Sequence, residues 1–326
     1  MVRRVLGLDE RIEESVEWLP CALHAVNALA WEREELLCFP VSPALRRVRL
    51  AVRGLPSQRS PAGDELCFLA LLAPMATASF LVEPGSADTR PRLAPARSGG
   101  QWLLRNRFVE AAFDAASGGL RRLGNASLAA FFEVFNTSHV PGEHMSNRYF
   151  ALFNSSAPHA PDVPGPPRAW LLRGPVFSEV VQEVDARNLT LSFRLPGDGC
   201  RTRELCAFLQ ATARVGPVGW NNDVFLAFAQ RADGGSEQLS FATDQNGLFL
   251  RPRSPYCPNC TLGGLLQPGT VHAALGPLRL FADRPRAYMA QVLVSRCFLR
   301  FFFFFCRGRC CGRRCTGAST APTRWC

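Results

Sequence analysis

The sequence predicts an all-β fold. Between Ala22 and Glu83, short apolar runs such as LLCFPV, RRVRLAV and ELCFLALL alternate with turns that contain proline and serine, a pattern typical of strands. Further along, the pair Asn246-Gly247 lies between two stretches of alternating apolar residues and predicts a hairpin with a two-residue type I′ turn. At 326 residues and 47% hydrophobic, the chain is long enough to bury two cores. We therefore expect two successive β domains.

Composition divides the chain into several segments. They are a short helix, a small β domain, a linker, a large β domain and an unstructured tail, over residues 1–21, 22–84, 85–99, 100–290 and 291–326. The helix is amphipathic and is ended by Pro20, whereas the linker is rich in Pro, Gly, Ser and Arg. The tail alternates Cys with Arg. Its apolar run between Arg300 and Arg307 is far shorter than the about 20 residues that span a bilayer, so we expect no transmembrane span.

The net charge of +10 comes from arginine alone, because the chain contains no lysine. Proteins that bind nucleic acid concentrate basic residues along one face, with aromatic residues between them. Here the arginines are scattered through apolar strands. We therefore expect no nucleic-acid partner.

The sequence carries signs of a glycoprotein of the secretory pathway. Several asparagines head N-x-Ser/Thr sequons, namely Asn125, Asn136, Asn154, Asn188 and Asn259. The first residues, MVRRVLGLDE, lack the apolar run of a signal peptide. Cys257 and Cys260, in CPNC, form either a disulfide or two free thiols. Cys200 and Cys206 flank a predicted short strand and could bridge a hairpin.

Catalytic and metal-binding motifs are sparse. The chain contains neither a G-x-S-x-G nucleophile motif nor an H-x-D pair. His139 and His144 lie five positions apart around a Pro-Gly turn, beside Glu143, and form either a metal site or an exposed loop. We expect no catalytic residue, bound metal or cofactor in this chain.

Residues 22–290 contain a series of motifs: HAVNALAWEREELLCFPVS, SQRSP, LLRNRFVEAAFDAASGGLRRL, SNRYFALFN, FATDQNGLFLRPR and GPLRLFADRPRA. Their order and spacing resemble the C-terminal half of glycoside hydrolase family 38, the class II α-mannosidases. The most specific are the V-x-N-x-L-x-W-x-R strand of the first and the T-D-x-N-G hairpin, followed by arginines, of the fifth. The resemblance implies a small β-sandwich and then a large antiparallel supersandwich of galactose-mutarotase-like fold. Trp31, Phe108, Phe113 and Leu120 are expected in the cores.

Members of this family hydrolyse terminal α-mannosyl residues of glycans, using an aspartate nucleophile and a zinc ion that belong to an N-terminal domain. The resemblance implies that this chain is the C-terminal part of such an enzyme and is inactive alone. Its implied partners are mannose-containing glycans and the catalytic domain, on the same or a separate polypeptide, in the lysosome, vacuole or another secretory lumen. Tyr149, Arg251 and Arg253 are the implied substrate contacts. The alternative is a stand-alone, non-catalytic carbohydrate-binding β protein.

Overall fold

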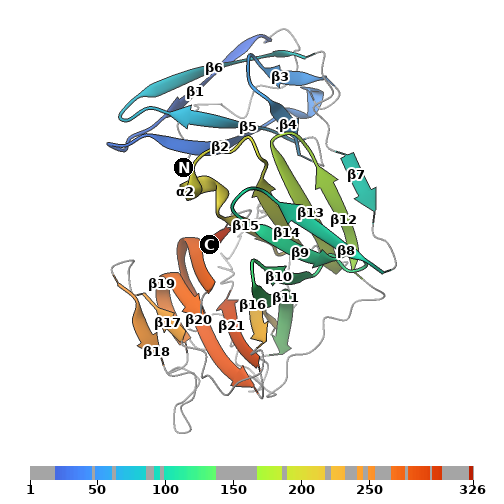
Figure 1. Cartoon of the computed structure of the whole chain (residues 1–326), viewed down its shortest axis with the longest axis vertical. Coiled ribbons are helices and arrows are strands. Elements are labelled where there is room, and N and C mark those ends of the chain that lie inside the picture. Colours follow the sequence, from blue (N-terminus) through green and yellow to red (C-terminus); the bar gives the residue numbers. More distant parts are fainter. Residues whose placement is uncertain are drawn as a thin grey trace, which may run out of the picture.

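The computed structural model shows a small β-sandwich above a large antiparallel sheet (Figure 1). The residues that it describes are 19–45, 48–60, 64–85, 92–95, 99–136, 167–185, 189–216, 222–231, 241–244, 249–253, 266–275, 278–293, 296–302 and 323–325. The predicted N-terminal helix lies outside these residues, apart from its last positions, where Cys21 already begins a strand.

The small sandwich consists of two three-stranded antiparallel sheets. One sheet has the order β1 (Cys21–Val26), β6 (Thr77–Pro84) and β3 (Leu50–Val52). The other has the order β2 (Arg33–Pro40), β5 (Glu65–Leu72) and β4 (Ser57–Arg59), and a short 3-10 turn, η2 (Pro43–Leu45), follows β2. The three apolar runs of the sequence become β2, β3 and β5, which confirms the predicted β character of this region.

Strand β5 explains why one of these runs is apolar without interruption. Leu66, Phe68 and Leu72 point into the sandwich core, where Phe68 packs against two other phenylalanines. Cys67 and Leu69 point the other way, toward residues of the large sheet. From Leu66 to Ala70 the strand has apolar neighbours on both faces and needs apolar side chains at every position, so this part of the run does not alternate.

The large sheet has 16 strands, and all its described neighbours pair antiparallel. Its main path has the order β7-β12-β13-β14-β15-β22-β20-β21-β16-β11-β10-β9-β8, and β17, β18 and β19 branch from β20. The strands, with the short helix α2, are β7 (Arg92–Pro95), β8 (Gln101–Arg105), β9 (Glu110–Asp114), β10 (Leu120–Leu123), β11 (Ala126–Asn136), β12 (Arg168–Arg173), β13 (Phe177–Asp185), β14 (Leu189–Pro196), α2 (Arg203–Cys206), β15 (Leu209–Arg214), β16 (Asn222–Arg231), β17 (Phe241–Thr243), β18 (Arg251–Arg253), β19 (Leu266–Leu275), β20 (Leu278–Leu293), β21 (Arg296–Phe302) and β22 (Thr323–Trp325).

The two ends of this sheet face each other across one core. The ring of Phe113 on β9 lies 5.3 Å from that of Phe193 on β14, and both side chains are fully buried. Arg173 of β12 donates a 3.0 Å hydrogen bond to the carbonyl of Leu103 on β8, the terminal strand of the path. The sheet therefore closes on itself as a sandwich. The predicted fold class, all-β with a small sandwich followed by a large antiparallel one, is confirmed.

Several boundaries and core assignments differ from the sequence prediction. Residues 92–95, inside the predicted linker, form β7, because backbone pairing with β12 needs no apolar signal of its own. The predicted unstructured tail contributes β21 and β22, since a run too short to span a membrane is still long enough for a strand. Phe113 and Leu120 are buried as expected, but Phe108 is 39% and Trp31 61% exposed, because both lie in connections between strands.

Candidate functional site

The hairpin that carries the predicted substrate contacts is formed by β17 and β18. Phe241 pairs with Arg253 and Thr243 with Arg251, while the other edge of β17 pairs with β19. The carbon at the centre of the Arg251 guanidinium lies 5.1 Å from the ring centroid of Phe249, a cation–π arrangement. Phe249 is 59% exposed and Arg251 is exposed as well. The hairpin thus presents an aromatic ring and a cation side by side to solvent.

The predicted turn at Asn246-Gly247 lies outside the described residues. The strands on either side of it do pair as the expected hairpin, with Thr243 opposite Arg251. Pairing with β19 on the other edge sets which face of β17 is buried, and this constraint is invisible in the local sequence.

The predicted substrate contacts and sequons lie in different parts of the chain. Arg251 and Arg253 belong to β18. Asn125 is exposed in the turn between β10 and β11, and Asn136 is the last residue of β11, opposite Asn222. The other predicted residues lie outside the described part of the chain: Tyr149, His139, His144, Glu143, Asn154, Asn188, Asn259, Cys257 and Cys260.

The structure contains two disulfides among its described cysteines. Cys200 is joined to Cys206, and the segment between them holds helix α2 rather than the predicted strand. Cys38 is joined to Cys67, a pair that sequence reasoning missed. These two residues lie directly opposite each other on β2 and β5. Only the pairing register of two strands brings them together, so their spacing in the sequence carries no signal.

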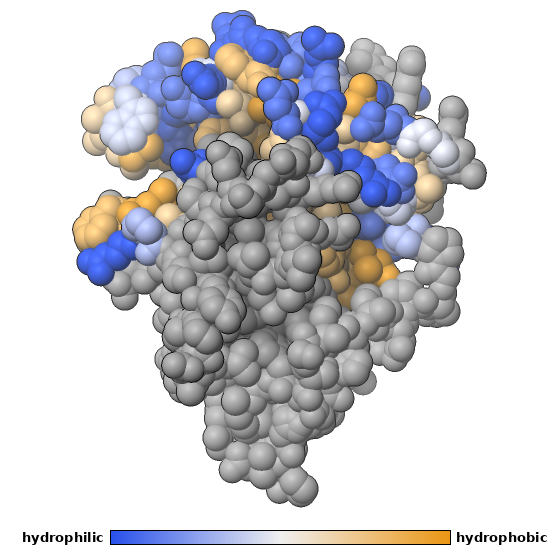
Figure 2. Space-filling view, turned by 60° about the horizontal axis from the view of Figure 1, so that its bottom comes forward, coloured by the Kyte–Doolittle hydropathy of each residue, from blue (hydrophilic) through white to orange (hydrophobic). Residues whose placement is uncertain are grey.

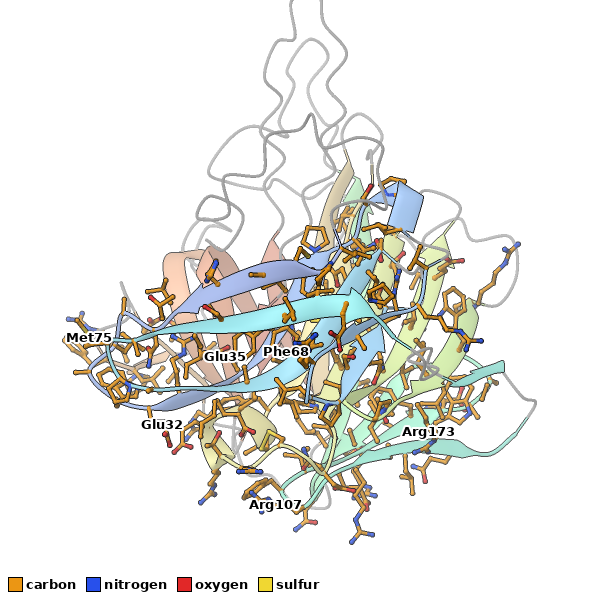
Figure 3. All side chains as sticks on the ribbon, turned by 90° about the horizontal axis from the view of Figure 1, so that it is seen from above. Glu32, Glu35, Phe68, Met75, Arg107 and Arg173 are labelled. Atoms are coloured by element: carbon orange, nitrogen blue, oxygen red, sulfur yellow. A yellow bond between two sulfur atoms is a disulfide. The ribbon has the colours of Figure 1, made fainter. Side chains whose placement is uncertain are left out.

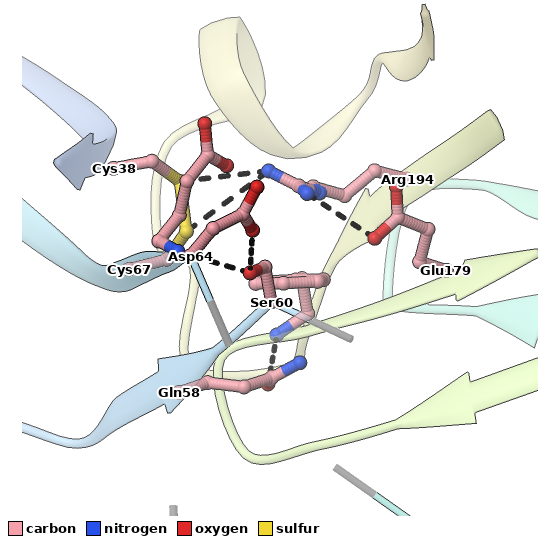
Figure 4. A network of polar contacts seen from close by, with 9 residues as sticks. Cys38, Gln58, Ser60, Asp64, Cys67, Glu179 and Arg194 are labelled. Atoms are coloured by element: carbon pink, nitrogen blue, oxygen red, sulfur yellow. Dashed lines mark hydrogen bonds and ion pairs between the residues drawn. A yellow bond between two sulfur atoms is a disulfide. The ribbon is translucent and has the colours of Figure 1, made fainter. Parts of the chain in front are cut away.

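A polar network between the sandwich and the large sheet surrounds this second disulfide (Figure 4). One guanidinium nitrogen of Arg194, Nη1, lies 3.5 Å from Sγ of Cys38, and the other, Nη2, donates a 3.1 Å bond to Oε2 of Glu179. The same guanidinium lies over the ring of Phe177, 4.2 Å from its centroid. Because Arg194 and Glu179 are both largely buried, their charges must compensate each other.

Two further side chains of the small sandwich accept hydrogen bonds from the large sheet. Oε1 of Gln58 accepts from the backbone N–H groups of Val176 and Phe177, at 3.0 and 3.1 Å. Oε2 of Glu34 accepts from the N–H groups of Arg201 and Thr202, both at 2.8 Å, and these residues directly precede helix α2. Buried polar groups of one domain therefore satisfy backbone groups of the other.

Two groups of described side chains have the composition of a metal site. They are Glu34 with Cys200 and Cys206, and Glu65 with Cys38 and Cys67. All four sulfurs are in disulfides and provide no thiolate, while Glu34 already accepts backbone N–H donors. These groups do not fit a zinc ion.

The described residues of the hairpin include an aromatic ring and a guanidinium but no pair of carboxyl groups. Among its described residues Asp244 is the only carboxylate, and it is buried. A glycosidase of this kind needs a pair of carboxyl groups that flank the bond to be cleaved. Aromatic and guanidinium groups can instead hold a sugar in place.

Comparison of the sequence with models of protein families and with curated proteins gives no match. Within the part of the chain that the structure describes, no helix is long and apolar enough to cross a membrane.

Proposed function

We propose that this chain is the C-terminal β portion of a family 38 α-mannosidase, with the zinc ion and the nucleophile on an N-terminal domain that the sequence does not include. In this role the chain supplies contacts to mannose-containing glycans. The observation that carries the proposal is the exposed pair of Phe249 and Arg251, on the hairpin that resembles the family's T-D-x-N-G motif.

The chemistry of this pair suits a sugar. The apolar C–H face of a pyranose can stack on an aromatic ring, and a guanidinium offers several N–H donors in a fixed fork to hydroxyl oxygens. Arg251 is already held over Phe249, so less side-chain freedom is lost when a sugar binds.

Other features support a role in the secretory lumen. The two disulfides are stable in an oxidising compartment, and the Asn125 sequon is exposed in a turn where a glycan can be attached. The predicted order of a small sandwich followed by a large antiparallel one also agrees with the resemblance. We propose the lysosome, the vacuole or a related lumen as the location.

The test is a calorimetric titration of the full chain with α-linked mannose oligosaccharides. Arg251→Ala removes a charged hydrogen-bond donor and should weaken binding by about 2 kcal/mol, or roughly thirtyfold in Kd. Phe249→Ala should also weaken it, by removing the stacking surface. Arg214→Ala, which changes another exposed arginine at the end of β15, is the matched control and should leave binding unchanged. Equal affinity in all four proteins would refute the proposed site.

A further inference from the structure

The small sandwich ends in an apolar tip, formed by residues 26–31, from the end of β1 into the loop that follows, and by residues 71–76, from the end of β5 into its following loop. Neither stretch, VNALAW or LLAPMA, contains a charged residue, although 20% of the chain is charged. The exposed members of the tip are Val26, Ala28, Ala30, Trp31, Leu71, Ala73, Pro74 and Met75. Figure 3 places Met75 at an extremity of the molecule, and Figure 2 shows hydrophobic atoms at this end of the small sandwich. The tip thus projects into solvent as a convex apolar surface.

The exposed large hydrophobic side chains are concentrated here. Those of the described residues are Val26, Trp31, Leu71, Met75, Leu103, Phe108 and Phe249, and the first four belong to the tip. Trp31 is 61% and Met75 72% exposed. Soluble proteins rarely gather such residues on one surface unless it contacts a partner or a membrane.

A buried asparagine holds the two loops of the tip together. Nδ2 of Asn27 donates to the carbonyls of Trp31, Leu72 and Ala73, at 2.8, 3.2 and 2.9 Å, and Oδ1 accepts from the N–H of Leu29 at 3.1 Å. The backbone N–H of Asn27 reaches the carbonyl of Ala76 at 2.9 Å. One side chain therefore satisfies backbone groups of both loops.

The second loop is also held in a conformation that costs free energy. Met75 has a φ of 47°, a region that a residue with a β-carbon rarely adopts, and its N–H donates to the carbonyl of Leu29 at 2.9 Å. A glycine would meet this geometry more easily. The sequence instead presents here a methionine side chain that is 72% exposed.

These features distinguish a lipid surface from a protein surface. A loop that enters the boundary of a bilayer loses water as a hydrogen-bond partner, which favours internal partners such as Asn27, whose side chain binds three carbonyls and one N–H of the tip. Tryptophan is favoured at the membrane interface, and the absence of charge within residues 26–31 and 71–76 avoids the cost of burying an ion in hydrocarbon. The nearest charges, Glu32 next to Trp31 and Arg33 opposite Leu72, lie at the edge of the tip. A convex tip also fits a deformable surface without a matching cavity. We infer that the apolar tip docks the protein on a neutral lipid surface.

The experiment is co-sedimentation of the full chain with phosphatidylcholine vesicles. The protein should sediment with them at low and at high salt, because the contact is apolar, and adding phosphatidylserine should change little. Trp31→Ala should lower the partition coefficient about tenfold, as expected for losing one large apolar side chain from the interface. Met75→Ser should lower it further. Thermal unfolding monitors the fold, which these exposed positions should leave intact.

Phe108→Ala is the matched control, since it removes an exposed aromatic ring from the large sheet and should leave vesicle binding unchanged. Three results would overturn the inference. The first is no binding to phosphatidylcholine, and the second is binding that high salt abolishes, which would point to the arginines. The third is a dimer in solution that Trp31→Ala dissociates, which would make a second copy the occupant of the tip.

Discussion

The guanidinium of Arg194 lies 3.5 Å from the sulfur of Cys38, although the two residues belong to different β domains and are 156 positions apart. The cation also binds Glu179 and covers the ring of Phe177. It therefore joins the disulfide of the small sandwich to the large sheet, and the two domains share one buried polar network.

Replacing Arg194 should destabilise this network strongly. Arg194→Met keeps an unbranched apolar stem but leaves the carboxylate of Glu179, which is only 4% exposed, without its cation. The expected loss is about 3 kcal/mol in the free energy of unfolding, measured by urea denaturation without reductant. Arg194→Met combined with Glu179→Met should recover most of it, because no unpaired charge is then buried.

Arg53→Met is the matched control for this experiment, since Arg53 bridges Glu83 on the surface of the sandwich. An exposed pair contributes at most about 1 kcal/mol. If the Arg194 variant were no less stable than the Arg53 variant, the buried pair would not be important for the contact between the domains.

Gly174→Ala should also weaken the contact between the domains. A β-carbon at this position would lie 2.1 Å from Oε1 of Gln58, the atom that accepts from Val176 and Phe177. Gln58 can move aside only by giving up these hydrogen bonds, so we expect a loss of about 1–3 kcal/mol. Gly199→Ala is the control, because its β-carbon would meet Leu69 at an ordinary 3.8 Å. Equal melting temperatures for the two variants would contradict this reading.

The stability conferred by Asp114 should depend on pH. The hydrogen bond from the Ser117 hydroxyl, at 2.5 Å, is the main cause that lowers the pKa of Asp114 below its ordinary value. A lowered pKa stabilises the folded state above the unfolded pKa of about 4, and this stability is lost as the pH falls through the folded pKa. Ser117→Ala should therefore cost stability at neutral pH, and the difference from the wild type should narrow in acid. Urea unfolding of the two proteins at neutral and at acid pH measures this difference in stability. If the difference is the same at both pH values, the effect of the substitution is due to packing.

The chain alone should not hydrolyse α-mannosides. Hydrolysis needs groups that stabilise the transition state at the reacting carbon, and the described part of the hairpin offers a single carboxylate, the buried Asp244, rather than a flanking pair. We expect residues 1–326, supplied with zinc, to release no aryl group from an aryl α-mannoside above the buffer rate. Turnover that chelation and Arg251→Ala both abolish would show that an active centre lies within this chain.

The candidate hairpin shows what the local sequence can predict about this part of the fold. Alternating apolar residues around Asn246-Gly247 predict that the chain reverses here, and β17 does pair with β18. β17 also pairs with β19, about 30 residues further along the chain, and no local pattern indicates this neighbour; the predicted turn itself lies outside the described residues. No sequence pattern marked Phe249 as a candidate site residue, and its contact with Arg251 is seen only in the structure.

By itself, the sequence determined that three apolar runs of the small sandwich form strands, which are β2, β3 and β5, because apolar runs are local properties of the chain. The apolar run ELCFLALL predicts a strand, and β5 forms there. Only the tertiary structure decided that Cys38 meets Cys67, that Arg194 covers their disulfide and that Trp31 faces solvent. Each of these depends on which distant strand or loop lies opposite, and that choice is made by packing across the whole fold rather than by neighbours in the sequence.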